Sequence, residues 1–142
     1  MTGGHGSASP GGAQPLGVAR RWWRVAFVVY AVALHAMTHA PGVRTPGMDL
    51  ARTDLAAHLG AFAVWTALFH AAGLAGPWLE WRAVARAVAV GALAGAADEL
   101  SQSVPGFNRV VDPADAVANT LGALLAGVVL LVVARVARAR GG

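Results

Sequence analysis

Polar side chains able to do chemistry are concentrated in the segment from residue 98 to residue 119 of this 142-residue chain. The segment holds acids, amides and one arginine, at Asp98, Glu99, Gln102, Arg109, Asp112, Asp115 and Asn119. Carboxylates can act as general acids or bases, and the planar fork of arginine matches phosphate. Long apolar segments precede and follow. Between two candidate membrane helices such a cluster is costly, which favours a functional role.

A second polar pair precedes another apolar segment. Asp54 and His58 are four residues apart and therefore share a helix face. If Asp54, Glu99 and Asp115 meet near His58 and Arg109, the acids outnumber the arginine. One acid must then stay protonated, His58 must be cationic, or a cation must bind. Because no helix-spaced HExxH signature is present, we expect no metal, and the sequence does not identify a cofactor.

The composition indicates an integral membrane protein. The chain is 56% hydrophobic and 13% charged, against about 25% charged in soluble domains. The absence of cysteine excludes disulfides and thiolate metal sites. All the basic residues are arginines, and most of them flank apolar runs. That placement fits membrane topology and a lipid bilayer as partner, and we expect no nucleic acid partner.

Four apolar segments predict an all-α bundle of four transmembrane helices over residues 20–140. Residues 1–19 are rich in Gly, Ser, Ala and Pro and predict a disordered tail. The first apolar run, Val25–Met37, follows a collar of arginine and tryptophan. We expect an anchored helix there, and a signal peptide is the alternative.

The other helices have local boundary signals. Residues 41–53 should form a loop, with Thr53 or Asp54 capping a helix over Leu55–Leu74. The third helix is expected over Trp81–Ser103, before Pro105. An Asp N-cap followed by proline predicts that the fourth helix begins at Asp112–Pro113, with apolar sequence continuing to Ala134.

Helical spacing predicts which side chains face inward. Gly91 and Gly95 form a GxxxG step that allows close helix packing, and Glu99 is next on that stripe. Asp98, about 100° away, should lean toward solvent or headgroups. Asp115, Asn119 and Gly122 share a face of the fourth helix. We expect His35 and His39 to be interfacial and His70 to be structural.

The arginines predict the orientation. With the N-terminus inside, the inner side holds Arg20, Arg21, Arg24, Arg82, Arg86, Arg135, Arg138 and Arg140, and the outer side holds Arg44, Arg52 and Arg109. This bias predicts a multi-pass cell-membrane protein with both termini cytoplasmic. The candidate site residues then fall at the outer ends of the second to fourth helices and their connecting loop: Asp54, His58, Glu99, Gln102, Arg109, Asp115 and Asn119.

The pattern resembles the VanZ-like family of small bacterial membrane proteins. The similarity lies in Glu99 and Gln102 near one helix end, Arg109 in the loop, and Asp115 and Asn119 in the next helix. Asp54 followed by His58 is also typical, although the family usually has Lys where this chain has Leu55. The resemblance covers about residues 25–135. The family is named for a protein associated with low-level resistance to teicoplanin, a glycopeptide antibiotic that acts outside the cell.

Three functional interpretations stay open. In the first, the polar pocket binds an envelope lipid headgroup or a cell-wall precursor, with Arg109 as the anion ligand and Gln102 and Asn119 hydrogen bonding. In the second, the protein is an intramembrane enzyme acting on a lipid-linked substrate, with Glu99 or His58 as acid or base. In the third, the polar residues form a structural network in which Asp115 pairs with Arg109 and Glu99 pairs with His58.

Overall fold

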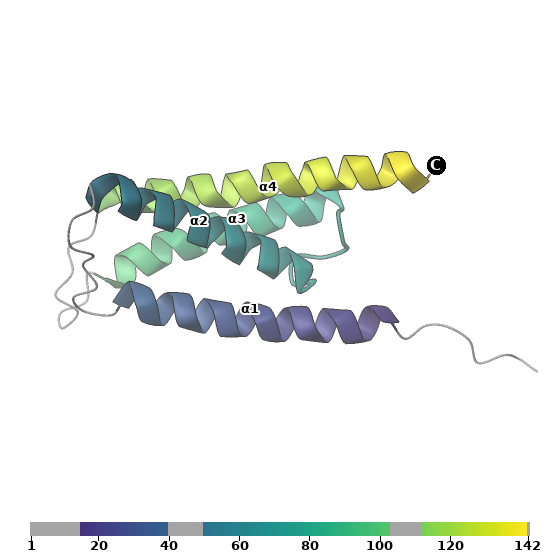
Figure 1. Ribbon diagram of the computed structural model, residues 1–142, viewed down its shortest axis with the longest axis horizontal. Helices are drawn as coiled ribbons and strands as arrows, with labels where there is room; N and C mark the ends of the chain where they lie inside the picture. Colours follow the sequence, from purple (N-terminus) through teal and green to yellow (C-terminus); the bar gives the residue numbers. More distant parts are fainter. Residues whose placement is uncertain (1–14, 40–49, 103–111, 142) are drawn as a thin grey trace, which may run out of the picture.

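The computed structural model describes residues 15–39, 50–102 and 112–141. These residues form four α-helices and no strand: α1 (Pro15–His39), α2 (Leu50–Ala71), α3 (Trp81–Ser101) and α4 (Pro113–Gly141). Successive helices run in opposite directions along one long axis (Figure 1). For the described residues, the expected all-α fold is therefore confirmed.

The first helix begins earlier than predicted. α1 starts at Pro15, so the tail expected over residues 1–19 is wrong for its last five residues, and residues 1–14 lie outside the described part. Proline suits the first turn of a helix, because its fixed φ matches helical geometry and no hydrogen-bond partner is needed there for a backbone N–H.

The second helix also begins early. α2 starts at Leu50, so Thr53 and Asp54 lie inside the helix and are not its caps, which corrects that prediction. Leucine, alanine and arginine are strong helix formers, and they allow the helix to include the residues before Thr53. α2 ends at Ala71 rather than at Leu74, in a turn that contains Gly73 at φ +71°.

The boundaries of α3 and α4 follow their local signals. α3 begins at Trp81 as predicted and ends at Ser101, two residues before the predicted end. α4 begins at Pro113, and Oδ1 of Asp112 accepts a hydrogen bond from the backbone N–H of Ala114 at 2.8 Å. The predicted Asp N-cap is confirmed.

Glycines allow α2, α3 and α4 to pack closely. A Cβ on Gly122 of α4 would collide with the backbone carbonyl of Leu59 in α2. A Cβ on Gly95 of α3 would lie 2.6 Å from Cβ of Asn119 in α4, and Gly91 is enclosed in the same way by α2 and α4 side chains. The close approach predicted for the GxxxG step is thus confirmed, and it occurs within one chain.

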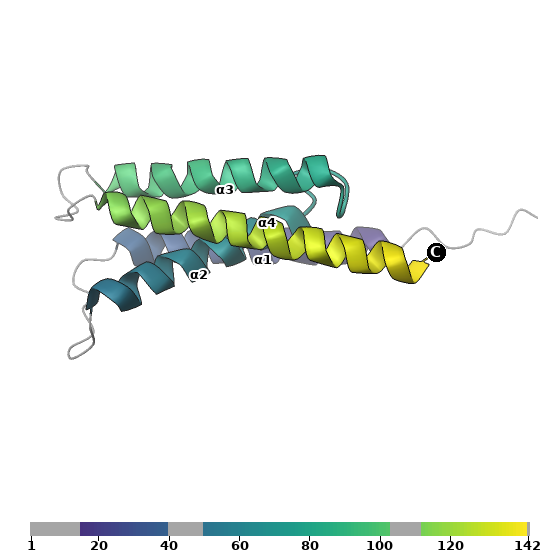
Figure 2. The same cartoon turned by 90° about the horizontal axis from the view of Figure 1, so that it is seen from above.

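α1 packs mainly against α2, on the side away from α4 (Figures 1 and 2). Phe27 of α1 contacts Trp65 and Phe69 of α2 edge-to-face, with ring centroids 5.0 and 5.5 Å apart. The hydroxyl of Tyr30 donates to the carbonyl of Ala61 at 3.0 Å. Edge-to-face aromatic pairs add to the free energy of packing, so α1 is held by specific contacts.

Among the described helices, α4 alone is long and apolar enough, over Pro113–Arg140, to cross a membrane. Apolar side chains on all four helices nevertheless face outward, and those more than 55% exposed include Val28, Val29, Val32, Leu93, Leu100, Val117 and Val128. At the same time, polar side chains are buried inside the bundle.

Candidate functional site

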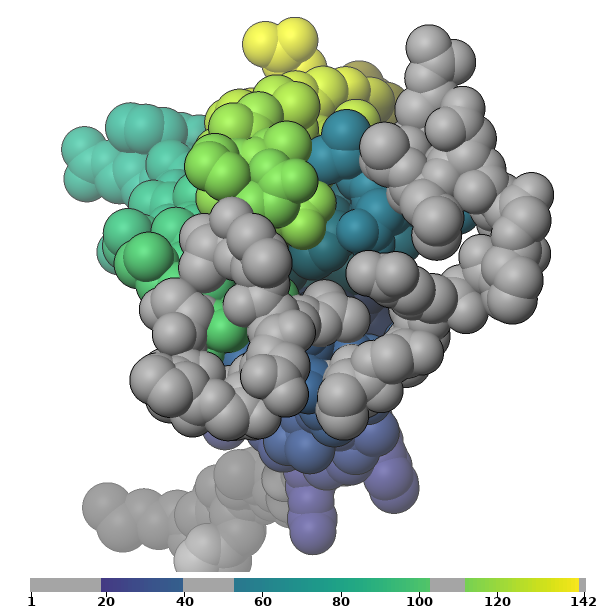
Figure 3. Space-filling model, turned by 90° about the vertical axis from the view of Figure 1, so that its left-hand side faces the viewer, coloured from purple at the N-terminus to yellow at the C-terminus, as the bar shows by residue number. Residues whose placement is uncertain are grey.

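Six of the seven predicted site residues lie at one end of the bundle. The end view in Figure 3 shows the start of α4 beside the start of α2 and the last turns of α3, with α1 below. Asp54 and His58 come from α2, Glu99 and Gln102 from the end of α3, and Asp115 and Asn119 from α4. Arg109, the seventh, lies outside the described residues, as does the pairing expected between Arg109 and Asp115.

His58 is the centre of the contacts between α2 and α4. Its side chain is buried, and Nδ1 lies 3.0 Å from Oδ1 of Asn119. Its Nε2 lies 3.5 Å from Oδ2 of Asp115 and 3.9 Å from Oδ1 of Asp54. Nδ1 of the imidazole is therefore held by an amide, while Nε2 faces two carboxylates.

The hydrogen bonds of Asn119 decide which nitrogen of His58 carries a proton. The Asn119 amide nitrogen donates to the carbonyl of Gly95 at 3.2 Å, so its Oδ1 is the atom that faces His58. An amide oxygen only accepts, so Nδ1 of His58 must donate. A bare Nε2 would point a lone pair at carboxylate oxygens. The arrangement therefore favours a cationic or donor group between Nε2 and the acids.

The exposed fractions separate residues that a ligand can reach from those that it cannot. The side chain of Asp54 is 66% exposed, that of Asp115 is 17% exposed and that of His58 is 9% exposed. Asn119 is fully buried, with both polar groups engaged inside the bundle. Asp54, Asp115 and the Nε2 edge of His58 form the accessible part of the site. Asn119 positions His58 and does not face a ligand.

Glu99 faces the interior, as its place on the glycine stripe predicted, and is 2% exposed. Its Oε1 accepts the backbone N–H of Asp112 at 2.7 Å, and its Oε2 lies 3.5 Å from Nε2 of Gln102. The carboxylate thereby joins the last turn of α3 to the start of α4. The pairing of Glu99 with His58 expected in a structural network is not found among these described residues. Gln102 is likewise buried and supports Glu99.

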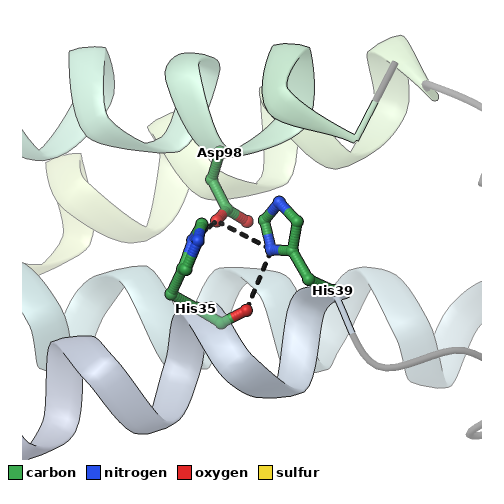
Figure 4. Close-up of side chains that lie close together, drawn as sticks. All are labelled: His35, His39 and Asp98. Carbon is green, nitrogen blue, oxygen red and sulfur yellow. Dashed lines mark hydrogen bonds and ion pairs between the residues drawn. The ribbon is translucent and has the colours of Figure 1, made fainter. Parts of the chain in front are cut away.

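A second polar cluster, which sequence reasoning missed, lies between α1 and α3. Asp98, expected to lean toward solvent or headgroups, instead packs against α1 with a side chain only 9% exposed. Its Oδ1 accepts the hydroxyl of Thr38 at 3.1 Å and lies 3.3 Å from Nδ1 of His35 and 3.9 Å from Nδ1 of His39. Figure 4 shows both imidazoles of α1 turned toward this carboxylate.

The spacing of the α1 residues held a signal for this cluster. His35 and His39 are four residues apart and lie on one helix face with Thr38 between them. Which helix they would face, however, depends on how α1 packs, and spacing alone does not specify that. The prediction that Asp98 leans outward failed for this reason.

His70 lies at the opposite end of the bundle and is fully buried. Its Nε2 accepts the backbone N–H of Leu79 at 3.2 Å, and its ring stacks on Trp78 with centroids 5.1 Å apart. Leu79 has φ +58°, a backbone conformation that is unfavourable for leucine. The expected structural role of His70 matches these contacts, because they stabilise the turn between α2 and α3.

Two groups of side chains in the described residues could supply three ligand atoms to a metal ion. One is His35, His39 and Asp98, and the other is Asp54, His58 and Asp115. Within each group the ligand atoms all lie within 4.8 Å of one another. Both groups mix imidazole and carboxylate, a donor set that suits first-row transition metals.

Comparisons of the chain with protein-family models, with curated proteins and with solved structures gave no match.

Proposed function

We propose that this protein spans the cell membrane with all four helices and binds the headgroup of an envelope lipid or lipid-linked cell-wall precursor at its outer end. The observation that carries the proposal is the position of His58. This buried imidazole is fixed by Asn119 and presents Nε2 to two partly exposed carboxylates. Such a site can hold an ammonium or hydroxyl donor between the acids.

The distribution of apolar and polar side chains supports the membrane setting. In the most apolar stretch of α4, only 39% is buried inside the bundle, so most of the apolar surface of this helix faces outward. Meanwhile Thr66, Glu99 and Asn119 are at least 98% buried. A soluble bundle would bury its valines and leucines instead, because exposed apolar surface is unfavourable in water. A lipid environment makes the observed arrangement favourable.

The arginines support the proposed orientation. α1 and α3 begin, and α4 ends, at the end opposite to the candidate site (Figure 1), and those helix ends contain Arg20, Arg21, Arg24, Arg82, Arg86, Arg135, Arg138 and Arg140. An excess of arginine marks the cytoplasmic side of a membrane protein. The site would then open at the outer leaflet, with both termini cytoplasmic.

The chemistry of the site favours a headgroup that carries both a positive and a negative charge. Asp54 and Asp115 would receive an amine or hydroxyl donors, and Arg109 of the adjoining segment would bind phosphate through its planar fork. The resemblance to the VanZ-like family supports an effect on glycopeptide susceptibility, since those drugs act on the outer face.

An intramembrane enzyme is the second candidate. The observation in its favour is the same orientation of His58, because a general base needs a fixed tautomer and a third group that orients the ring. Nε2 of His58 would then exchange a proton with the substrate, and Asp115 would stabilise the imidazolium that forms.

Variants at the accessible and supporting positions test the proposal. We expect Asp115→Asn and Arg109→Lys to accumulate in membranes at the normal level. Both variants should lose lipid retention, and any effect of the native chain on teicoplanin susceptibility should disappear. Glu99→Gln tests the supporting carboxylate. Glu80→Gln, an exposed acid at the opposite end, is the matched control. Lipid retention is measured by native mass spectrometry of protein in nanodiscs of phosphatidylethanolamine, phosphatidylglycerol and undecaprenyl phosphate.

The outcomes separate the three interpretations. Retention of one lipid class that is lost in Asp115→Asn but kept in Glu80→Gln supports a binding site. Conversion of a radiolabelled undecaprenyl-linked lipid by the purified protein, abolished in His58→Gln, supports the enzyme. Loss of accumulation in all the site variants, with no lipid preference in the native chain, would contradict both and favour a structural network.

A further inference from the structure

We propose that His35, His39 and Asp98 form a binding site for a divalent transition-metal ion such as Zn²⁺, between α1 and α3. The three side chains converge from two helices, and no part of the cluster belongs to the His58 site (Figure 4). The metal site therefore does not depend on the headgroup proposal.

The geometry is close to that of a zinc site. Four ligands at about 2.0–2.1 Å in a tetrahedron are separated from one another by about 3.3 Å. Oδ1 of Asp98 lies 3.3 Å from Nδ1 of His35 and 3.9 Å from Nδ1 of His39. The two imidazole centroids are 4.0 Å apart. Small side-chain rotations would bring all three donor atoms to coordination distance of one ion.

A buried oxygen without a partner points independently to a ligand. Oδ1 of Asp98 accepts the hydroxyl of Thr38, but Oδ2 is buried and has no hydrogen-bond partner among the described residues. A buried carboxylate oxygen without a partner is unfavourable, because the hydration it has lost is not replaced. A metal ion held between the imidazoles and in contact with both oxygens of this carboxylate would supply the missing interaction.

Ser101 provides the outer support that metal-binding histidines usually have. Nε2 of His39 lies 2.8 Å from Oγ of Ser101, and that hydroxyl donates to the carbonyl of Asp98 at 2.6 Å. Because the serine proton is used there, Nε2 of His39 is the donor. This directs Nδ1 toward Asp98 as the coordinating atom, in the arrangement by which a second hydrogen bond fixes the tautomer of a metal ligand.

Without an ion, Nδ1 of His39 lies 2.9 Å from the carbonyl oxygen of His35 and can donate a proton to it. A metal ion at Nδ1 would take the place of that proton, since metal ligands bind in their deprotonated form.

An open coordination position would face a groove. A cavity of about 330 Å³ between α1, α2 and α3 is lined by His35, Asp98 and Ser101 at its polar end and by apolar side chains, including Leu34, Phe62 and Trp65, elsewhere. Three protein ligands leave a fourth position for water or for an oxygen of a bound molecule. The imidazoles favour Zn²⁺, Co²⁺ or Fe²⁺ over Mg²⁺ and Ca²⁺, which prefer oxygen ligands.

The sequence expectation of no metal was based on the missing HExxH signature. That signature supplies two histidine ligands and a glutamate base from one helix. Here His35 and His39 have the same spacing on α1 without the glutamate, and the carboxylate is on α3. Helix packing brings the third ligand, Asp98, to the histidine pair. The spacing of residues along the chain does not predict this contact.

Zinc binding by the full-length protein tests the site. The protein is purified in detergent through a tag without histidine, stripped with chelator and titrated with Zn²⁺ in competition with a chromogenic chelator. We expect one equivalent to bind, with affinity reduced at least tenfold in His39→Gln and Asp98→Asn. Ser101→Ala should weaken binding about 10-fold to 100-fold, as outer-shell substitutions do. Co²⁺ should give the visible absorption bands of a tetrahedral site.

Two control sets make the result specific. His58→Gln and Asp115→Asn alter the other candidate cluster, and His5→Ala removes a histidine outside the described residues. All three should keep the full equivalent of Zn²⁺. The proposal is overturned if the native chain binds no Zn²⁺, if binding is lost in His58→Gln and kept in Asp98→Asn, or if only weak binding removed by His5→Ala is seen. Helix content by circular dichroism shows whether each variant is folded.

Discussion

Nδ1 of His58 and Oδ1 of Asn119 lie 3.0 Å apart across the interface between α2 and α4. This contact joins two helices and also sets the orientation of the imidazole toward Asp115. The same amide donates to the carbonyl of Gly95, so one buried side chain connects α2, α3 and α4. The stability of the bundle and the form of the site thus depend on the same residue.

Asn119→Leu should therefore destabilise the fold. The change leaves the Nδ1–H group of His58 buried without an acceptor, which costs about 1–3 kcal/mol in the free energy of unfolding. Val117→Ala changes an exposed side chain of the same helix and should have a smaller effect. Unfolding in detergent with increasing dodecyl sulfate, followed by circular dichroism, gives both values. Equal stability of Asn119→Leu and the native chain would show that the amide is not a structural support.

Glycine substitutions in α2 and α4 provide a matched pair. In Gly122→Ala the new methyl group would collide with the backbone carbonyl of Leu59, so the two helices must separate. Gly60 has no heavy atom within 4 Å of the position of a new Cβ. Gly60→Ala should be neutral or stabilise by up to about 1 kcal/mol, because alanine favours the helix. The same unfolding measurement should place the two variants on opposite sides of the native chain, and a destabilised Gly60→Ala with an unchanged Gly122→Ala would contradict the packing described.

The start of α4 depends on Asp112. Its carboxylate accepts the backbone N–H of Ala114, so Asp112→Ala should lower the free energy of unfolding by about 1 kcal/mol. Asp112→Asn keeps an acceptor at the same place and should lose less. Both variants keep the backbone N–H that Glu99 accepts, so the effect reports on the cap alone. A comparison of their unfolding midpoints checks the order, and equal losses would mean that the charge matters more than the cap.

Thr66 is expected to be a destabilising polar residue. It is fully buried in α2, and its hydroxyl has no partner among the described residues. Thr66→Val keeps nearly the same shape and removes the unpaired group, so it should raise the free energy of unfolding by about 1 kcal/mol. Thr66→Ala, which leaves a small cavity, should gain less. If Thr66→Val is less stable than the native chain, the hydroxyl must bond to a group outside the described residues or to water.

Local signals predicted the parts of the fold that local chemistry controls. The start of α4 follows from an aspartate before a proline, and the inward position of Glu99 follows from its place on the stripe of Gly91 and Gly95. The predicted start of α2 was wrong. A capping residue at Asp54 competes with a helical stretch before it, and the sequence does not show which of the two prevails.

The position of α1 relative to α3 could not be predicted from the sequence. Asp98 was expected to lean outward because its own helix has Glu99 on the inward stripe. Its actual partners, Thr38 and His35, come from a helix about 60 residues earlier. Contacts of this kind depend on helix packing, so the polar cluster between α1 and α3 emerges only in the structure.

The cysteine-free chain allows a direct test of membrane orientation. Ala114→Cys lies at the start of α4 beside the candidate site, and Glu80→Cys lies at the opposite end before α3; both positions are exposed. If the helices span the membrane as proposed, an impermeant maleimide added to intact cells should label Ala114→Cys, while Glu80→Cys should react only after permeabilisation. The reverse pattern would invert the orientation, and labelling of both positions from one side, or recovery of the protein in the soluble fraction, would remove the spanning bundle on which an outer-leaflet site depends.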